Sequence, residues 1–218
     1  MGRSTGRRRR AGAEAGLGRD GDLAAALRRA AEALIVERGP QGFSLREVAR
    51  RARVSEAAPY WHFANKEALL AAVAEAGFVA LAAALEAVRG RIKEPGRRLR
   101  ELGIAYVRFA LAHPAHLRLM FGPEIADKAA SPGLKSAAER AFGLLVAAIA
   151  EAQRAGRIRR GDAEEMAVAA WSLVHGLSAL LIDRQLARRV TTARDAEILA
   201  GRLTRLLQTG LAPRPMKA

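Results

Sequence analysis

Cysteine is absent from this chain of 218 residues. Without a thiol the chain can form no disulfide, no thiolate metal site and no cysteine nucleophile, and nothing points to an oxidising compartment. Aromatic residues make up only 5% of the sequence, and alternating runs of β-branched and aromatic residues are missing. Because such runs are the signature of strands, their absence argues against any sheet and predicts an all-α fold.

Acidic residues are outnumbered by basic ones, 22 to 37, which gives a formal net charge of +15 at pH 7. This balance favours partners with negative charge, such as nucleic acid or an anionic membrane surface. The excess is spread, with six bases against two acids over residues 1–20, eight against six over 21–68 and twenty-three against fourteen over 69–218. The charge therefore supports a nucleic-acid partner without locating the surface that binds it.

A membrane-spanning segment is not expected. The best candidate, residues 166–182, has no formal charge but is shorter than the roughly 20 apolar residues that a spanning helix needs, and it contains His175 and Gly176. We interpret it as a buried helix of a soluble bundle. The arginines at residues 7–10 are followed by no apolar stretch, so we expect no secretory signal and a cytoplasmic protein.

The N-terminal part of the chain changes character at residue 22. Residues 1–21 are rich in arginine and glycine without apolar periodicity, which predicts a flexible basic arm. Apolar residues then recur at helical spacing, so Asp22 is expected to cap a helix that runs to about Arg38. Gly39 and Pro40 follow and are expected to end it.

Three further helices are predicted in quick succession. Ser44 and Glu47 form a capping-box pattern, which predicts a helix over residues 45–52. After a two-residue turn Ser55 is expected to cap a short third helix, and Asn65 a fourth that runs from residue 66 to about 89. A tight turn between the second and third short helices is the signature of a helix-turn-helix, so residues 22–68 are predicted to form a DNA-binding domain.

Pro59 lies inside the predicted third helix, where a proline normally costs roughly 3 kcal/mol. With Ser55 as the cap, Pro59 falls at the end of the first turn and removes a single hydrogen bond, to the Ser55 carbonyl. We therefore expect a short recognition helix that is irregular at its start.

The rest of the chain, residues 69–210, is predicted to be a second helical domain, followed by a tail over residues 211–218. Its helices are read from caps, prolines and glycines. The predicted spans are 97–112, 115–121, 132–155, 163–186 and 192–208.

Residues 54–69 read VSEAAPYWHFANKEAL. This stretch resembles the DNA-binding domain of TetR-type (TetR/AcrR) transcriptional regulators, in which a Val-Ser turn precedes a short recognition helix that ends in Tyr-x-His-Phe, followed by Lys-Glu-x-Leu at the start of helix four. The resemblance implies a homodimeric repressor that a small-molecule effector releases from a palindromic operator in double-stranded DNA. Arg53 departs from the family pattern, which has Gly at this left-handed end of helix two, and the departure costs roughly 1 kcal/mol.

The resemblance and the residue types together predict the DNA contacts. Small side chains allow close approach to base edges, Glu56 can accept from a cytosine amino group, and hydroxyl, imidazole and ammonium groups can bind phosphates. Phe63 is assigned to the core, and Trp61 faces either the groove or the backbone. The alternative reading makes the aromatics core and the arginines solvated charges. The predicted DNA-binding residues are Ser44, Arg46, Arg53, Ser55, Glu56, Ala57, Ala58, Tyr60, Trp61, His62 and Lys66.

Residues 171–176 read WSLVHG and resemble the Trp-x-x-x-His-Gly (WHG) element that names one branch of the family's C-terminal domains. Trp171 and His175 share a helix face and can line an effector pocket. The alternative is that Trp171 belongs to the core and His175 hydrogen-bonds within it. The predicted effector-binding residues are Tyr106, Phe109, Met120, Phe121, Trp171 and His175.

The last two helices are predicted to form the dimer. Small residues at 169, 170, 176, 178 and 179 permit close packing, and the apolar face of the last helix can complete a four-helix bundle across a two-fold axis. No catalytic residue, metal site or cofactor is predicted. Two other functions stay open: a basic protein that coats nucleic acid without reading its sequence, and an all-α enzyme suggested by the histidines alone.

Overall fold

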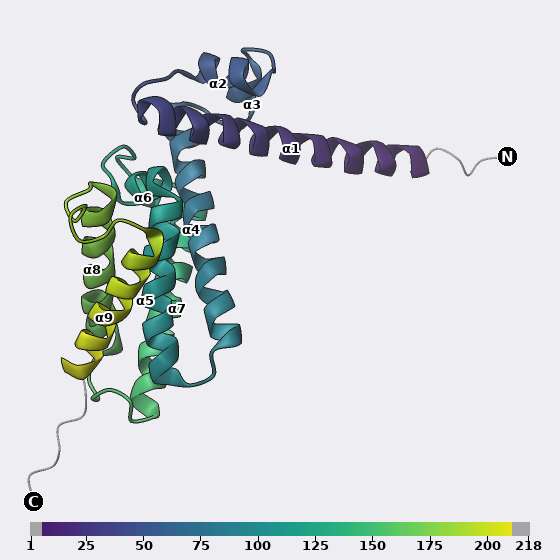
Figure 1. Ribbon diagram of the computed structural model, residues 1–218. Coiled ribbons are helices and arrows are strands. Elements are labelled where there is room, and N and C mark those ends of the chain that lie inside the picture. The colour runs from purple at the N-terminus through teal and green to yellow at the C-terminus, as the bar shows by residue number, and fades with distance from the viewer. Residues whose placement is uncertain (1–5, 211–218) are drawn as a thin grey trace, which may run out of the picture. The chain divides into compact units, whose positions relative to one another are not determined.

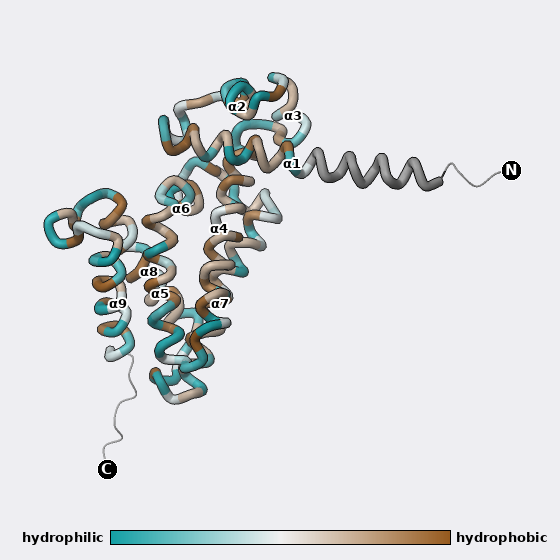
Figure 2. The backbone as a smooth tube through the Cα atoms, turned by 45° about the vertical axis from the view of Figure 1, so that its right-hand side comes forward, coloured by the Kyte–Doolittle hydropathy of each residue, from teal (hydrophilic) through white to brown (hydrophobic). Residues whose placement is uncertain are grey.

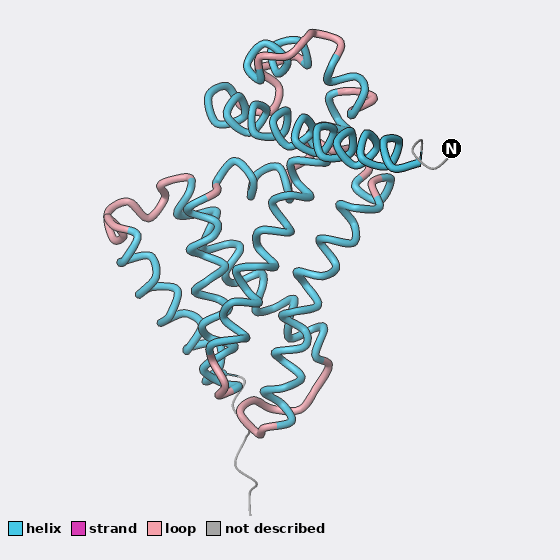
Figure 3. The backbone as a smooth tube through the Cα atoms, turned by 90° about the vertical axis from the view of Figure 1, so that its right-hand side faces the viewer, coloured by secondary structure: helices cyan, strands magenta, loops and turns pink. Residues whose placement is uncertain are grey.

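The computed structural model describes residues 6–210, with side chains from residue 21 onward. Every regular element in that part is helical and none is a strand, which confirms the predicted all-α class (Figures 1 and 3). The chain forms two compact units. The first contains the chain up to Val73 together with Gly122–Ala126, and the second contains Ala74–Phe121 and the chain from Asp127 onward.

The first unit holds α1 (Gly6–Arg38), α2 (Leu45–Ala52), α3 (Ala58–His62) and the start of α4 (Lys66–Arg91). Each of these helices turns its apolar face toward the core, as expected for amphipathic helices. The buried side chains of this core include Leu27, Leu34, Val48, Phe63 and Leu69. The predicted assignment of Phe63 to the core is thus confirmed.

The start of α1 differs from the prediction. The helix begins at Gly6 and not at Asp22, so most of the predicted arm is helical. Alanine and arginine are strong helix formers, no proline interrupts the stretch, and an isolated glycine costs a helix only about 1 kcal/mol. Residues 1–5 of the predicted arm lie outside the described residues.

Helix α2 has the predicted bounds and the predicted capping box between Ser44 and Glu47. It ends at Arg53, whose φ of 58° and ψ of 42° place it in the left-handed region. The sequence therefore located this turn correctly, together with the side chain that strains it.

The recognition helix α3 begins later than predicted. Ser55 is not its cap: Ala58 N donates to Ser55 O in a preceding turn, and the N-cap residue is Ala57, whose side chain has no hydrogen-bonding group. Pro59 consequently falls in the first turn, where a backbone N–H has no helical acceptor and its absence costs nothing. Pro59 is fully buried, so it serves as a core residue of a helix only five residues long.

The second unit is a bundle of long helices. It holds the rest of α4 and then α5 (Pro95–Ala112), α6 (Pro114–Phe121), the 3-10 turn η1 (Lys128–Ala130), α7 (Pro132–Arg154), α8 (Ala163–Ile182) and α9 (Ala193–Gly210). α5 packs against α7, α8 and α9. Figure 2 shows α9 alternating between hydrophilic and hydrophobic positions, as expected for a helix with one exposed face.

Two helices, α4 and α8, are long and apolar enough to span a membrane by length and composition alone. The apolar stretch of α4 is 56% buried, as in the core helix of a soluble protein. The stretch in α8 is only 28% buried, so the prediction of a buried helix holds for one side of α8 and not for the other. α8 also ends at Ile182, before the predicted residue 186.

Candidate DNA-binding surface and effector cavity

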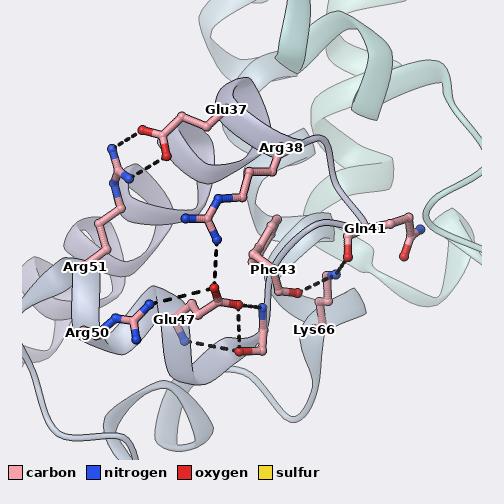
Figure 4. Close-up of polar contacts among 9 residues, drawn as sticks. Glu37, Arg38, Gln41, Phe43, Glu47, Arg50, Arg51 and Lys66 are labelled. Atoms are coloured by element: carbon pink, nitrogen blue, oxygen red, sulfur yellow. Dashed lines mark hydrogen bonds and ion pairs between the residues drawn. The ribbon is translucent and has the colours of Figure 1, made fainter.

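A network of hydrogen bonds fixes the start of α2 (Figure 4). Glu47 Oε2 accepts from Ser44 N at 2.9 Å and from Ser44 Oγ at 3.1 Å, and Ser44 Oγ accepts from Glu47 N at 3.3 Å. These bonds from the Ser44 backbone and hydroxyl hold the pKa of Glu47 below its ordinary value. The Ser44 hydroxyl already donates its proton to Glu47. It could donate to a phosphate only if this hydrogen bond to Glu47 broke.

Lys66 ties the start of α4 to the loop before α2. Its Nζ donates to Phe43 O at 2.8 Å and to Gln41 O at 3.2 Å, and it lies 4.5 Å from the centre of the Phe43 ring (Figure 4). Burial lowers the pKa of this ammonium. Two of its three donors are occupied within the protein, which leaves one for the predicted phosphate contact.

The aromatic residues of α3 divide between the core and solvent. Phe63 is buried, whereas Tyr60 is 52% and Trp61 85% exposed. The neighbouring rings of Tyr60 and Trp61 are thus both accessible to a partner. The alternative reading of these aromatics as core is therefore wrong for Tyr60 and Trp61.

The other predicted DNA contacts surround this short helix. Arg46 on α2 pairs with Glu56 in the turn before α3, Nε to Oε2 at 3.7 Å, and both side chains are about three-quarters exposed. Such an exposed pair contributes less than about 1 kcal/mol, so either partner can exchange it for DNA. Ser55, Ala57 and Arg53 are exposed, and Ala58 and His62 are half-buried.

One contact of the first unit was not predicted. The carboxylate of Glu67, in the first turn of α4, accepts from Ala126 N at 2.8 Å, and Ile125 beside it is buried. The segment Gly122–Ala126 thus completes the first unit, although it lies some sixty residues further along the chain. No local pattern signals a contact over that separation.

The second unit contains a cavity of about 440 Å³. Three of the six predicted effector residues, Tyr106, Phe121 and Trp171, line it, and His175 lies behind them. The remaining lining residues are apolar with one exception: Phe78, Leu81, Leu85, Ala138, Glu139, Ala141, Phe142, Leu145 and Val168.

Phe109 and Met120 do not line this cavity, so their predicted role is not supported. Phe109 is buried with its ring 5.0 Å from that of His113, at the end of α5. Met120 is buried against Gly77 of α4, where an added Cβ would lie only 2.7 Å from the Met120 Sδ. Both residues have the apolar type that a pocket wall needs, but their side chains are buried in packing contacts between helices.

A polar trio borders the cavity. Tyr106 Oη lies 2.8 Å from His175 Nδ1 and accepts from Trp171 Nε1 at 3.3 Å. Burial lowers the pKa of His175 and raises the pKa of Tyr106 to about 12, so both groups are neutral at pH 7. The Phe121 ring meets His175 at 4.7 Å and Trp171 at 5.4 Å between centroids. Trp171 therefore lines the cavity, whereas His175 hydrogen-bonds behind the wall, as the alternative reading of this histidine expected.

The outer faces of α8 and α9 carry exposed apolar side chains, including Leu180 and Ile198, each 46% exposed, and Leu206, 68% exposed. A groove of about 780 Å³ lies between the two helices. Ser178 was predicted to belong to this face but is fully buried, and its Oγ donates to Val174 O at 2.7 Å.

Comparison with known proteins agrees with this division of the chain. Residues 27–73 match the family described as bacterial regulatory proteins, tetR family, and residues 99–207 match the tetracyclin repressor-like C-terminal domain. No curated protein matches the chain.

Solved structures show the same fold. A protein of unknown function from Rhodococcus sp. RHA1 is 37% identical with a TM-score of 0.78, over 88% of this chain and 96% of that one. The TetR family transcriptional regulator PfmR from Thermus thermophilus is 21% identical with a TM-score of 0.67, over 86% and 99%. The fatty acid degradation regulator FadR from Bacillus halodurans is 15% identical with a TM-score of 0.70, over 85% and 98%. With the C-terminal match covering half of its residues, the chain belongs to the TetR family of DNA-binding transcriptional regulators.

Proposed function

We propose that this protein is a cytoplasmic homodimeric repressor, released from a palindromic operator when a small molecule occupies the cavity of its second unit. The observation that carries the proposal is the exposed pair Tyr60 and Trp61 on the recognition helix. The same helix is held by the buried Phe63, and the neighbouring α2 is held by its capping box. We also assign the chain to the branch with the Trp-x-x-x-His-Gly element, because the Trp171 and His175 rings contact each other beside the cavity and His175 is hydrogen-bonded to Tyr106 in its wall.

The recognition helix is expected to enter the major groove. Ala57 and Ala58 leave room beside base edges, and Glu56 can exchange Arg46 for a cytosine amino group. Trp61 is expected to place its ring against a thymine methyl or the sugar-phosphate backbone, while Tyr60 and His62 bind phosphates. Because Ser44 is engaged with Glu47, its contribution is to position α2.

The dimer is expected to form through the exposed faces of α8 and α9. Their apolar side chains would be buried in a four-helix bundle between two copies, which suits a helix that is only 28% buried within one copy. A two-fold dimer would present two recognition helices about 34 to 36 Å apart, or a multiple of that spacing, as a palindromic operator requires.

Fluorescence anisotropy tests the proposal. The full chain is titrated against labelled DNA from its own promoter region and against random duplex of equal length at matched salt. We expect the promoter DNA to bind at least about 100-fold more tightly. Trp61→Ala should weaken promoter binding, whereas Val36→Ala, at an exposed position on α1, should not. Equal affinity for both duplexes would refute specific binding.

The competing function is a coating protein that binds nucleic acid through charge alone, favoured by the net charge of +15. Deletion of residues 1–21 separates the two. A coating protein should lose its binding with the six arginines of that stretch, whereas a specific regulator should keep its preference for promoter DNA with reduced affinity.

A further inference from the structure

The cavity of the second unit is lined almost wholly by hydrocarbon. Five aromatic rings contribute to its wall, from α4, α5, α6, α7 and α8, and most other lining residues are leucine, valine or alanine. A volume of about 440 Å³ falls in the range that holds small organic molecules. Burial against such a wall favours an apolar ligand in proportion to the area that it removes from water.

Charge is nearly absent from this wall. Among the described residues that line the cavity none is Lys or Arg, although the chain carries 37 of them. The one charged lining residue, Glu139, has a side chain that is 67% exposed and lies 3.8 Å from Lys135, so water and Lys135 screen it. An anion inside the cavity would lose its hydration without meeting a cation, which is strongly unfavourable.

Within the part of the chain that the structure describes, Tyr106 is the one lining residue with a hydroxyl, so its Oη is the candidate for a single polar anchor. A phenol has one donor and two acceptor positions, and two of these three are used by Trp171 and His175. If His175 Nδ1 is bare, Tyr106 donates to it and keeps one acceptor position. If Nδ1 carries the proton, Tyr106 accepts it and keeps its own proton to donate. In either tautomer the hydroxyl offers one further hydrogen bond.

We infer that the cavity takes a neutral, largely apolar molecule whose single hydroxyl, carbonyl or amide group is directed at Tyr106, and that it discriminates against anions. The inference rests on the proposed function, because it names the chemical class of the effector. It sets the cavity apart from a site for carboxylates or phosphate esters, which would require a basic side chain in the wall.

Three probes with one ring system test the charge selectivity by isothermal titration calorimetry on the full chain: 2-naphthalenemethanol, 2-naphthoate and 2-naphthylmethylammonium. We expect the alcohol to bind with a negative heat-capacity change and both ions to bind at least about tenfold more weakly. An ion that binds as tightly as the alcohol would overturn the inference, as would an alcohol that fails to bind.

Tyr106→Phe tests the anchor. It should weaken binding of 2-naphthalenemethanol about fivefold to tenfold and leave 2-methylnaphthalene, which has no polar group, unchanged. An equal loss for both probes would mean that Tyr106 only supports the wall, and the assigned hydrogen bond would be wrong.

A blocked cavity tests the location. Ala138→Trp should fill the space and abolish binding of the alcohol, whereas Ser136→Trp, an exposed position on the same helix outside the lining, should leave it intact. Circular dichroism and an unchanged midpoint of urea denaturation show that each variant is folded. A folded Ala138→Trp protein with normal affinity would place the ligand elsewhere.

The calorimetry contains no DNA, so this inference and the proposed function fail separately. If the alcohol binds in the cavity but does not release promoter DNA, the ligand class stands and the effector role is refuted. If the protein does not prefer promoter DNA, the proposed function as a regulator is refuted. The calorimetric data would still identify the class of ligand that the cavity binds.

Discussion

Backbone strain and side-chain burial at individual residues affect the free energy of unfolding, and single substitutions can measure these effects. Arg53 holds a left-handed conformation with φ of 58°, a region that is unfavourable for a residue with a Cβ. Arg53→Gly should therefore raise the free energy of unfolding by about 1 kcal/mol in urea denaturation.

Arg184 supplies the matched control because its φ is also 58° and it lies in the second unit. Arg184→Gly should stabilise the protein by a similar amount without changing its affinity for DNA. If Arg53 contacts a phosphate, Arg53→Gly should instead weaken DNA binding while it stabilises the fold. Destabilisation by Arg53→Gly would contradict the strain argument.

The partly buried ammonium of Lys66 leads to a second prediction at this scale. Lys66→Met keeps the length of the side chain but leaves the carbonyls of Gln41 and Phe43 without their donor, so unfolding free energy should fall by about 1–3 kcal/mol. Lys135→Met, at an exposed lysine, should change it little. Similar unfolding free energies for both variants would show that the Lys66 bonds contribute nothing.

His175 should make stability depend on pH. Burial lowers the pKa of His175 in the folded protein, so the unfolded chain takes up a proton first as the pH falls through about 6.5. Stability from the neutral imidazole is therefore present above that pH and is lost as acidification continues toward the lowered pKa. In urea denaturation at pH 7.5 and 5.5, wild type should lose more stability than His175→Asn, and equal losses would contradict the prediction.

Among the elements, the helices with strong end signals were predicted best. α2 has its predicted bounds because Ser44 and Glu47 form a complete capping box, and Asn65 Oδ1 caps α4 by accepting from Ala68 N at 2.8 Å. Asp162 caps α8 in the same way. Hydrogen bonds between residues a few positions apart determine these helix ends, so the residue types in the sequence are enough to predict them.

The misplaced start of α3 depends on packing. α3 has no side-chain cap and is too short to be stable alone, so its start is set by the burial of Pro59 and Phe63. The candidate sites follow the same rule: Tyr60 and Trp61, which come from one motif, both lie in solvent and stay predicted DNA contacts, while Phe109 and Met120 lie outside the cavity lining. Their side-chain directions depend on how whole helices pack, which spacing alone does not specify.

A prediction at the scale of elements follows for α3. Phe63→Ala should cost about 3–5 kcal/mol because it removes a buried ring from the core that holds this helix. DNA binding should be lost with the first unit, while calorimetric binding of 2-naphthalenemethanol to the second unit should persist. Simultaneous loss of both activities would show that the two units unfold as one.

For the whole molecule, the exposed faces of α8 and α9 predict its oligomeric state. Light scattering after size-exclusion chromatography should give a dimer, and Leu206→Glu should convert it to monomers because a charge would enter a buried apolar contact. Val79→Glu, at an exposed valine on α4 that is 54% accessible, should remain dimeric. A dimeric Leu206→Glu protein would place the interface elsewhere.

The position of Gly122–Ala126 in the chain limits where the coding sequence can be cut without splitting the first unit. The backbone passes between the two units three times, after Val73, after Phe121 and after Ala126. A fragment that ends at Val73 would lack Ile125 and the amide that Glu67 binds, and so would lack part of its own core. A single crossover after Val73 therefore cannot transfer an intact first unit to another protein, whereas a crossover after Ala126 transfers it only together with Ala74–Phe121 of the second unit. A chimera that exchanges the first unit alone must exchange two separate pieces of coding sequence together.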